Sequence, residues 1–540
     1  MRATSQDPGN DVDAIVVGGG HNGLVAAAFL ARAGLKPLVL EARPDTGGAA
    51  RTDTPWGPEF KMTSLSYVMS LMPPTIVDQL RLREHGYRVI PMGPTFVPYE
   101  DKRSLLLTED PARDYDQIAA FSRHDADAMI RYHAWLGGIG EILAPLLMRT
   151  PPKVASRRPG DLIDQLRLVW GMRGLDVRRA ADAVRLFTMS IADVLDEWFS
   201  SEQLKGVMAV NGIIGTWAGP CAPGTAYVMM HHTIGDLGDG AMGQWGYPVG
   251  GMGAVSAAIR ASAESFGATV LTDSSVERIL VADNRVTGVV TTDGREYHAP
   301  IVLAATHPAI TFLRQIARDQ LPSDFVTDIE RWRTRSGSVK VNVALSGLPR
   351  FAAAPDMPLE HYSGAIELAP SLDYLERAFT DAREGRAAAR PFADCAIPST
   401  LDPTLCPEGT HVMSMFTQWV PHTWATEPHR DELEAYADRV IAEFEAHAPG
   451  FTDLILHRQV IGPYEMEHEY GLIGGNIFHG ELTPDQLFHL RPAPGYADFT
   501  SPIRGLYQCS SATHGGGGVT GIAGYLCSRK VLADRRWWRR

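Results

Sequence analysis

Cysteine is scarce in this chain, and its cysteines are widely spaced. Only five occur among 540 residues, and no two of them form a C-x-x-C pair. This pattern is typical of a protein in a reducing compartment and argues against a thioredoxin-like redox disulfide. The chain also lacks H-E-x-x-H, G-x-S-x-G and any His or Cys cluster with zinc-ligand spacing. We therefore expect no metal site and no acyl-transfer nucleophile.

Long hydrophobic runs are absent as well. The longest uncharged stretch, residues 206–235, is interrupted by several glycines and by Pro220 and Pro223. A membrane-spanning helix needs ~20 mainly apolar residues with intact internal hydrogen bonding, so we expect none. Residues 1–13 are short and polar and resemble neither a secretory signal nor an arginine-rich transit peptide. We expect a cytoplasmic protein, or one of the mitochondrial matrix if the source is eukaryotic.

The chain also lacks an overall excess of positive charge. The chain has 50 basic and 63 acidic residues, so we expect no nucleic-acid partner. Two local segments are nevertheless basic: residues 149–185, and the tail 535–540, where two tryptophans lie between arginines. Both suit peripheral contact with anionic lipid. A solvated charged face and, for the tail, a disordered end remain open as alternatives.

The first fifty residues have the pattern strand, glycine turn, helix, strand. An apolar run at 13–17 leads into Gly-Gly-Gly-His-Asn-Gly at 18–23, which fits G-x-G-x-x-G. An alanine-rich helical segment at 24–33 and a second apolar run at 38–40 follow, with Glu41 at the end of that run. A G-x-G-x-x-G in this context predicts a bound dinucleotide.

Each residue of this pattern has a physical role. Gly18 permits the tight turn, Gly20 lets the backbone approach a pyrophosphate, and Gly23 lets helix and strand pack closely. The helix N-terminus offers unpaired N–H groups and partial positive charge to the phosphates. Glu41 can accept hydrogen bonds from both ribose hydroxyls of an adenosine.

A second glycine pair, Gly47-Gly48, follows Glu41 closely and is not part of the nicotinamide fingerprint. The stretch from Glu41 through Gly48 resembles the E-x-R-x-x-x-G-G extension of FAD-binding flavoproteins in the amine oxidase and phytoene desaturase superfamily. The resemblance implies FAD as the cofactor. With the fingerprint, it implies cofactor contacts from Gly18, Gly20, Asn22, Gly23, Glu41, Ala42, Arg43, Gly47, Gly48, Ala49 and Arg51.

The C-terminal region supports the same resemblance. Residues 505–509 read as a strand, and the glycine-rich segment 510–521 is similar to the C-terminal flavin motif of the desaturases. This chain has Ser510 and Ala512 where the family usually has Gly, and Gly515 where it has Pro. Backbone N–H groups at a helix start there would stabilise negative charge on a reduced flavin. The resemblance implies flavin contacts from Ser511, Gly517, Gly518, Val519 and Thr520, and an adenine contact from Val276.

Further motifs narrow the resemblance. Among them are His-Asn-Gly-Leu-Val-Ala-Ala at 21–27, Asp-Val-Leu-Asp-Glu-Trp-Phe at 193–199 and Gly-Gly-Asn-Ile-Phe-His at 474–479. They are similar to the branch that contains the pyridine nucleotide-disulfide oxidoreductase domain-containing protein two of animals and its bacterial relatives. The similarity extends from about residue 13 to about residue 530.

These observations predict an α/β protein, α+β overall, in which a Rossmann-like FAD-binding domain is interleaved with other units. The FAD-binding domain is expected from residues 1–71, 240–310 and 496–540. A mainly helical insertion is expected at 72–239 and a substrate-binding domain at 311–495. Such a layout makes a cleft between domains, where ligands commonly bind.

Outside the fingerprint, no complete G-x-G-x-x-G directly follows a segment that reads as a strand. The near match at 251–256 ends in serine, and Pro248-Val249 before it does not read as a strand. We therefore expect one dinucleotide site and an external electron acceptor, such as oxygen or a quinone.

Flavin dehydrogenation requires a substrate C–H held over the flavin and the exclusion of water. Residues 207–230 are the candidate apolar lining, with plain hydrophobic core as the alternative. His514 and His232 are candidate proton relays, each of which could instead be a structural histidine bonded to backbone.

The sequence predicts an FAD-dependent oxidoreductase that dehydrogenates or oxidises an apolar, lipid- or polyene-like small molecule. Three alternatives stay open: a flavin amine oxidase, a redox-neutral carotenoid-type isomerase, and a non-catalytic flavin-containing regulatory protein. Flavin reduction by a substrate panel would separate them.

Overall fold

The computed structural model describes residues 12–108, 110–153, 156–157, 161–163, 165–166, 170, 177–238 and 242–538, with side chains up to residue 535 in the last segment. Parts of the two basic segments that we expected to touch lipid, Arg158, Arg167, Arg173, Arg539 and Arg540 among them, lie outside the described residues. In the described part of the chain, no helix has both the length and the apolar composition needed to cross a bilayer.

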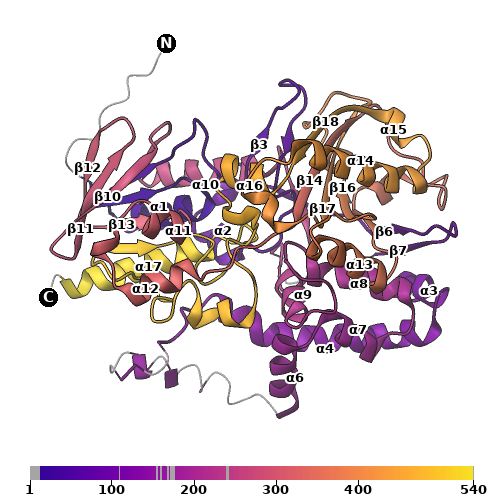
Figure 1. The fold of residues 1–540 in the computed structure, drawn as a ribbon, viewed down its shortest axis with the longest axis horizontal. Coiled ribbons are helices and arrows are strands. Elements are labelled where there is room, and N and C mark those ends of the chain that lie inside the picture. Colours follow the sequence, from indigo (N-terminus) through magenta and orange to yellow (C-terminus); the bar gives the residue numbers. More distant parts are fainter. Residues whose placement is uncertain are drawn as a thin grey trace.

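A five-stranded parallel sheet forms the centre of the dinucleotide-binding half (Figure 1). Its strand order is β19-β13-β1-β2-β9, and every neighbouring pair is parallel. β1 and β2 are buried throughout, as expected for short apolar strands covered on both faces. The predicted α/β class and Rossmann-like unit are confirmed. The strands are β1 (Ala14–Val17), β2 (Pro37–Leu40), β9 (Thr269–Leu271), β13 (Val302–Ala304) and β19 (Leu506–Gln508).

Two layers cover this sheet. Val16, Val39 and Leu303 pack under helices, whereas Ile15, Leu38 and Val302 point to the opposite face. The helical layer consists of α1 (His21–Arg32), α2 (Pro74–Gln79), α10 (Met252–Ser265) and α17 (Ile522–Trp538). The other layer consists of antiparallel β10 (Val276–Ala282), β11 (Arg285–Thr291) and β12 (Glu296–His298), with α11 (Pro308–Leu313) and α12 (Ser323–Glu330).

A second, seven-stranded sheet forms the other half of the molecule (Figure 1). Its order is β18-β14-β17-β16-β15-β6-β7, antiparallel except for the β15–β6 pair. One face packs under α14 (Arg430–His447) through alternate residues such as Val339 and Val341 of β14. The strands are β6 (Thr95–Pro98), β7 (Ser104–Leu107), β14 (Ser338–Leu345), β15 (Ala365–Leu368), β16 (Phe392–Ala396), β17 (His411–Gln418) and β18 (Ile455–Ile461).

Helices from the first long insertion lie below this sheet in Figure 1. They are α3 (Pro111–Ala119), α4 (Arg123–Leu147), α6 (Val177–Thr188), α7 (Ile191–Trp198), α8 (Glu202–Ile213) and α9 (Thr225–Thr233). The segment 72–239 that we expected to be mainly helical also contains α2, which packs with α1, and β6 and β7, which extend the larger sheet. Sequence reading missed these pieces because short apolar segments do not reveal which core they join.

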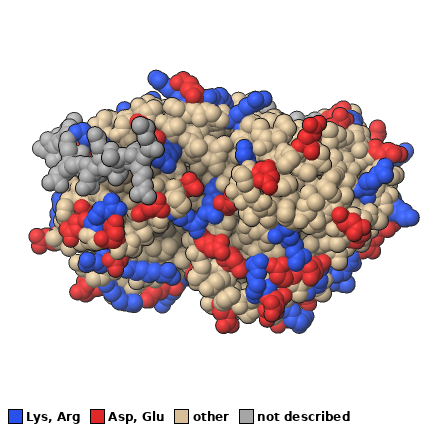
Figure 2. Space-filling model, turned by 90° about the horizontal axis from the view of Figure 1, so that it is seen from above, with Lys and Arg blue, Asp and Glu red and all other residues tan. Residues whose placement is uncertain are grey.

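Two further strands lie at the junction of the units. β5 (Val89–Pro91) pairs with β8 (Gly246–Pro248), directly before α10. The expectation that Pro248-Val249 is not a strand was therefore wrong for Pro248, which ends β8, although β8 is not part of the parallel sheet. On the face shown in Figure 2, acidic and basic side chains are interspersed, in keeping with the modest net charge of −13.

Candidate cofactor and substrate site

A cavity of about 1010 Å³ runs from the carboxyl end of β1 to the larger sheet and the helical insertion. That volume is at the upper end of the ~300–1,000 Å³ of typical ligand pockets. Exposed His133 of α4 is among its lining residues, so the cavity reaches the surface at the helical insertion. Most of the predicted cofactor-binding residues line it: Gly18, Gly20, Asn22, Gly23, Glu41, Ala42, Arg43, Gly47, Gly48, Ala49, Val276, Ser511, Gly518 and Val519.

The glycine turn leaves the start of α1 open to this cavity. Gly18 has φ +99°, and Gly20 precedes the helix without a side-chain cap. A Cβ added at Gly20 would meet nothing within 4 Å, whereas one at Gly23 would lie 2.2 Å from the Gly18 carbonyl oxygen. A ligand can therefore approach the helix N-terminus closely at Gly20, and close packing requires glycine at position 23.

Glu41 lies beside the turn and accepts hydrogen bonds from the backbone N–H groups of Gly19 (2.6 Å) and Arg43 (3.0 Å). Burial raises the pKa of its carboxyl, and the backbone groups of Gly19 and Ala42 partly oppose that effect. The second glycine pair approaches the first loop: the Gly47 N–H donates to the Gly19 carbonyl at 2.9 Å. The two loops thus form one continuous backbone cradle.

Unsatisfied polar atoms lie next to this cradle. His21 Nε2 and His479 Nδ1 are buried without a hydrogen-bond partner, and both residues line the cavity. The Oε1 atom of Gln315 is also buried and unpartnered, next to Val276, whose carbonyl accepts from Gln315 Nε2 at 2.9 Å. Buried polar groups are normally hydrogen-bonded. The open cradle and these atoms fit a polar, extended group such as a flavin dinucleotide.

The C-terminal segment is bound directly to the fingerprint helix. Asn22 Nδ2 donates to Ser511 Oγ at 3.0 Å, and Asn22 Oδ1 accepts from the Gly524 N–H at 3.3 Å. Gly518 and Val519, with φ of +99° and +57°, turn the chain along the cavity wall. The segments at the two chain ends therefore meet at one place.

Arg491 holds the same segment from the other side and was not singled out from the sequence. This buried guanidinium donates to the carbonyl oxygens of Phe478 (2.6 Å), Ser511 (3.1 Å) and Thr513 (3.1 Å). Burial lowers its pKa to about 10, so it stays protonated at neutral pH. Its role is to position the glycine-rich segment.

Three predicted cofactor residues do not line the cavity. Arg51 pairs with Asp53 at 2.9 Å and lies 4.5 Å over the Tyr470 ring. Thr520 Oγ1 accepts from the Ile522 N–H at 3.1 Å, at the start of α17. Gly517 packs against Phe478: a Cβ there would lie 2.8 Å from the Phe478 Cα. These three residues support the cavity wall without lining the cavity.

The two candidate histidines are placed differently. His514 lies outside the large cavity: its Nε2 is 3.1 Å from the Leu146 carbonyl oxygen, and burial lowers its pKa to about 4. His514 therefore corresponds to the structural alternative. His232 does line the cavity, with Nδ1 2.8 Å from the Asn211 carbonyl oxygen and 2.9 Å from that of Val228. Burial lowers the pKa of His232 as well, which favours the neutral ring.

The candidate apolar lining at 207–230 is divided between cavity and core. Met208 and Ile214 line the large cavity. Trp217 packs instead on Phe379 and His422, and Tyr227 stacks on Phe187. Both interpretations of this segment thus hold for part of it.

The sequence reading missed a row of polar side chains across the larger sheet. Strand register places Glu367 opposite Asp394, Asp394 opposite Phe416, and Phe416 opposite Lys340. Cross-strand partners share a face, and all four residues line the cavity. The available signal was a single charged residue within a short buried strand, as in Ala-Ile-Glu-Leu of β15 and Phe-Ala-Asp-Cys-Ala of β16.

This row is buried and hydrogen-bonded at one end. Lys340 is 1% exposed; its Nζ donates to Ser414 Oγ and lies 3.9 Å from the centre of the Tyr67 ring. Tyr67 donates its hydroxyl to Asp394 Oδ2 at 2.6 Å. Burial lowers the pKa of Lys340 to about 7 and raises that of Asp394. Burial and the Asp394 charge together raise the pKa of Glu367.

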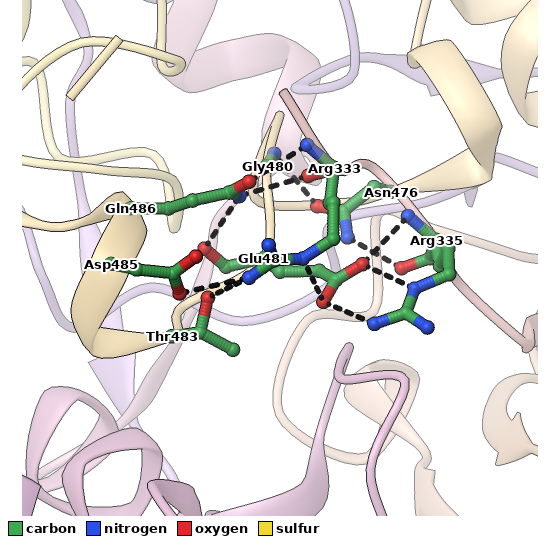
Figure 3. Close-up of polar contacts among 8 residues, drawn as sticks. All are labelled: Arg333, Arg335, Asn476, Gly480, Glu481, Thr483, Asp485 and Gln486. Atoms are coloured by element: carbon green, nitrogen blue, oxygen red, sulfur yellow. Dashed lines mark hydrogen bonds and ion pairs between the residues drawn. The ribbon is translucent and has the colours of Figure 1, made fainter. Parts of the chain in front are cut away.

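A polar network holds another wall of the cavity (Figure 3). Glu481, 5% exposed on its side chain, accepts two hydrogen bonds from the Arg335 guanidinium, at 2.7 and 2.9 Å. Asn476 Oδ1 accepts from the N–H groups of Phe478 and Gly480, both at 3.0 Å. The network ties the loop 476–486, which brings Phe478 into the cavity, to the segment that precedes β14.

In the second glycine run, at the start of α10, backbone N–H groups are hydrogen-bonded to side chains of the protein. The Met252 and Gly253 N–H groups donate to Thr63 Oγ1 (3.3 Å) and Thr52 Oγ1 (3.0 Å). The Gly250 N–H donates to Asp402 Oδ2 at 2.6 Å. These groups are not free to bind the phosphates of a second dinucleotide.

Comparison with known proteins agrees with this architecture. An NAD(P)-binding Rossmann-like domain family matches residues 16–79. Pyridine nucleotide-disulfide oxidoreductase domain-containing protein 2 of Rattus norvegicus is 41% identical over 546 residues, covering 97% of this chain and 94% of the relative. Prolycopene isomerase 1, a chloroplastic protein of an Oncidium hybrid cultivar, is 24% identical over 550 residues, covering 97% of this chain and 84% of that relative.

Among solved structures, cyclohexylamine oxidase from Brevibacterium oxydans has the same fold. Its TM-score is 0.57 at 17% identity, with 97% of this chain and 100% of that chain covered. The parallel sheet, the glycine fingerprint and the 41% identity to the rat protein over 97% of this chain all indicate the same family. The chain belongs to the family of pyridine nucleotide-disulfide oxidoreductase domain-containing protein 2.

Proposed function

We propose that this protein is an FAD-dependent oxidoreductase that dehydrogenates or otherwise oxidises an apolar small molecule and passes the electrons to an external acceptor. The observation that carries the proposal is the single cavity that joins the glycine cradle of α1 to the larger sheet and the helical insertion. A cofactor in the cradle and a substrate against the sheet would share one cavity.

FAD, when bound, would accept the electrons of a substrate C–H bond. The start of α1, Glu41 and the Gly47-Gly48 loop would hold its ADP half, with Val276 at the adenine. The wall beyond the cradle carries many apolar side chains, including Leu71, Met129, Met208, Ile214, Phe416 and Phe478. Such a wall excludes water and orients an apolar substrate by shape.

An external acceptor is supported because the chain offers one open dinucleotide cradle in its described part. The N–H groups before and at the start of α10 bond to Thr52, Thr63 and Asp402 instead. Oxygen, a quinone or another external acceptor would then reoxidise the cofactor.

The test is flavin content followed by anaerobic reduction. The purified protein should carry FAD or bind it when it is added, and an apolar lipid or carotenoid should bleach the flavin absorbance. Addition of oxygen or a soluble quinone should restore the absorbance. Protein that neither carries nor binds FAD would contradict the proposal, and bleaching by amines alone would contradict its substrate class.

A further inference from the structure

The polar row on the larger sheet is not needed to bind an apolar molecule. Glu367 and Asp394 stand opposite each other on β15 and β16, with Lys340 two strands further along. Burying charged groups is costly unless they are paired, so such a row within an apolar wall requires an explanation.

Glu367 is the member with an unsatisfied oxygen. Its residue is 9% exposed, and its Oε2 is buried without a hydrogen bond. Asp394, by contrast, accepts from Tyr67, and Lys340 donates to Ser414. Glu367 lines the cavity, so the unpaired oxygen belongs to the side chain that a molecule in the cavity would meet.

The charges of the row restrict which group Glu367 can receive. Burial raises the pKa of Asp394, and the Tyr67 hydrogen bond and the Lys340 charge partly oppose that effect. Burial and the Asp394 charge both raise the pKa of Glu367, which favours protonated Glu367. Glu367 then has an O–H donor and a carbonyl acceptor. An anionic ligand would have to be buried beside two carboxyl groups, and an ammonium would have to lose its hydration in the same buried site. An uncharged oxygen group, hydroxyl or carbonyl, suits both the donor and the acceptor.

We infer that the Glu367 carboxyl is a binding site for an uncharged oxygen group at one end of an otherwise apolar substrate. This inference rests on the proposed function and refines its substrate class: an oxygenated lipid or terpenoid rather than a pure hydrocarbon. Glu367 orients such a molecule in the cavity, while the apolar wall holds its chain.

The experiment compares 1-octanol, n-octane and octylammonium as competitors of Nile red bound to the purified protein. In the Glu367→Leu variant we expect octanol affinity to fall about tenfold relative to octane, about 1.4 kcal/mol. Glu367→Gln, which keeps a donor and an acceptor, should retain most of the octanol affinity. Glu469→Leu, which removes an exposed carboxylate elsewhere on the cavity lining, is the matched control and should change neither affinity.

Three results would overturn the inference: an unchanged octanol-to-octane ratio in Glu367→Leu, tighter binding of octylammonium than of octanol, or no displacement by octanol. Binding is measured on the protein as purified, whatever its flavin content. Loss of the proposed redox function, seen as absent FAD or absent bleaching, is therefore distinguishable from failure of the Glu367 site.

Discussion

Asn22 Nδ2 and Ser511 Oγ lie 3.0 Å apart although 489 positions separate them in the chain. The same amide accepts from the Gly524 N–H, so one side chain at the start of α1 binds both the glycine-rich segment and the α17 backbone. This contact brings the two ends of the described chain to one side of the cavity.

We expect Asn22→Ala to lower the free energy of unfolding by about 1–3 kcal/mol, because it leaves buried groups without partners. Ser511→Ala should cost less, since it removes only one of the two contacts. Urea unfolding of both single variants and the double variant gives the coupling energy, expected at about 0.5–3 kcal/mol. Additive effects would show that the two side chains do not interact in solution.

Gly20→Leu should abolish FAD binding while leaving the fold in place. A Cβ at Gly20 meets no protein atom within 4 Å, and the residue's φ of −65° suits any side chain, so the leucine would occupy the cradle itself. The measurement is the flavin-to-protein ratio after reconstitution with FAD.

Gly137→Leu is its control. A Cβ there also meets nothing within 4 Å, but Gly137 lies in α4 and does not line the cavity. Reconstitution of Gly20→Leu to the wild-type ratio would refute the assignment of the cradle.

Glu481→Gln should destabilise the protein by about 1–3 kcal/mol, because it removes a buried carboxylate that binds the Arg335 guanidinium through two hydrogen bonds. Asp485→Asn breaks a more exposed pair, since Asp485 is 60% exposed on its side chain, and should cost no more than about 0.5 kcal/mol. Thermal unfolding of the two variants at equal pH compares the costs. Equal losses of stability in the two variants would mean that the burial of Glu481 does not strengthen its contribution to the network in Figure 3.

The free energy of unfolding should rise with pH between about 7 and 10.5, because Lys340 loses its proton at a lower pH in the folded protein than in the unfolded chain. Burial lowers its pKa to about 7 from 10.5, so between these values the unfolded chain binds a proton that the folded protein does not. The free energy of unfolding then increases with pH, by at most about 1.4 kcal/mol per pH unit from this group. Below pH 7 both states carry the proton and the contribution is constant.

Lys340→Met should lose this rise, measured by urea unfolding at several pH values between about 7 and 10. Lys102→Met, at an exposed lysine after β6, controls for the loss of one positive charge. A Lys340→Met variant whose pH dependence matches wild type would show that Lys340 is not buried in its neutral form above neutral pH.

Much of the dinucleotide-binding half could be predicted from sequence because its signals are local. The strand at 14–17, the glycine turn and Glu41 lie within about thirty consecutive positions, and spacing alone defines their geometry. The second glycine pair and the C-terminal segment were predicted by resemblance to known motifs rather than by periodicity. Residues such as Arg51 and Thr520 were placed in the site, although their side chains bond to protein groups behind its wall.

The amino-acid sequence by itself determined that a Rossmann-like unit would form, because glycine at positions 18, 20 and 23 meets backbone constraints that act over a few residues. Only the tertiary structure decided which polar groups face the cavity. Glu367, Asp394 and Lys340 come from three strands of one sheet, and their meeting depends on strand register. Register is set by long-range packing of both sheet faces, which no local pattern encodes. The same packing turned His514 toward the Leu146 carbonyl and away from the cavity.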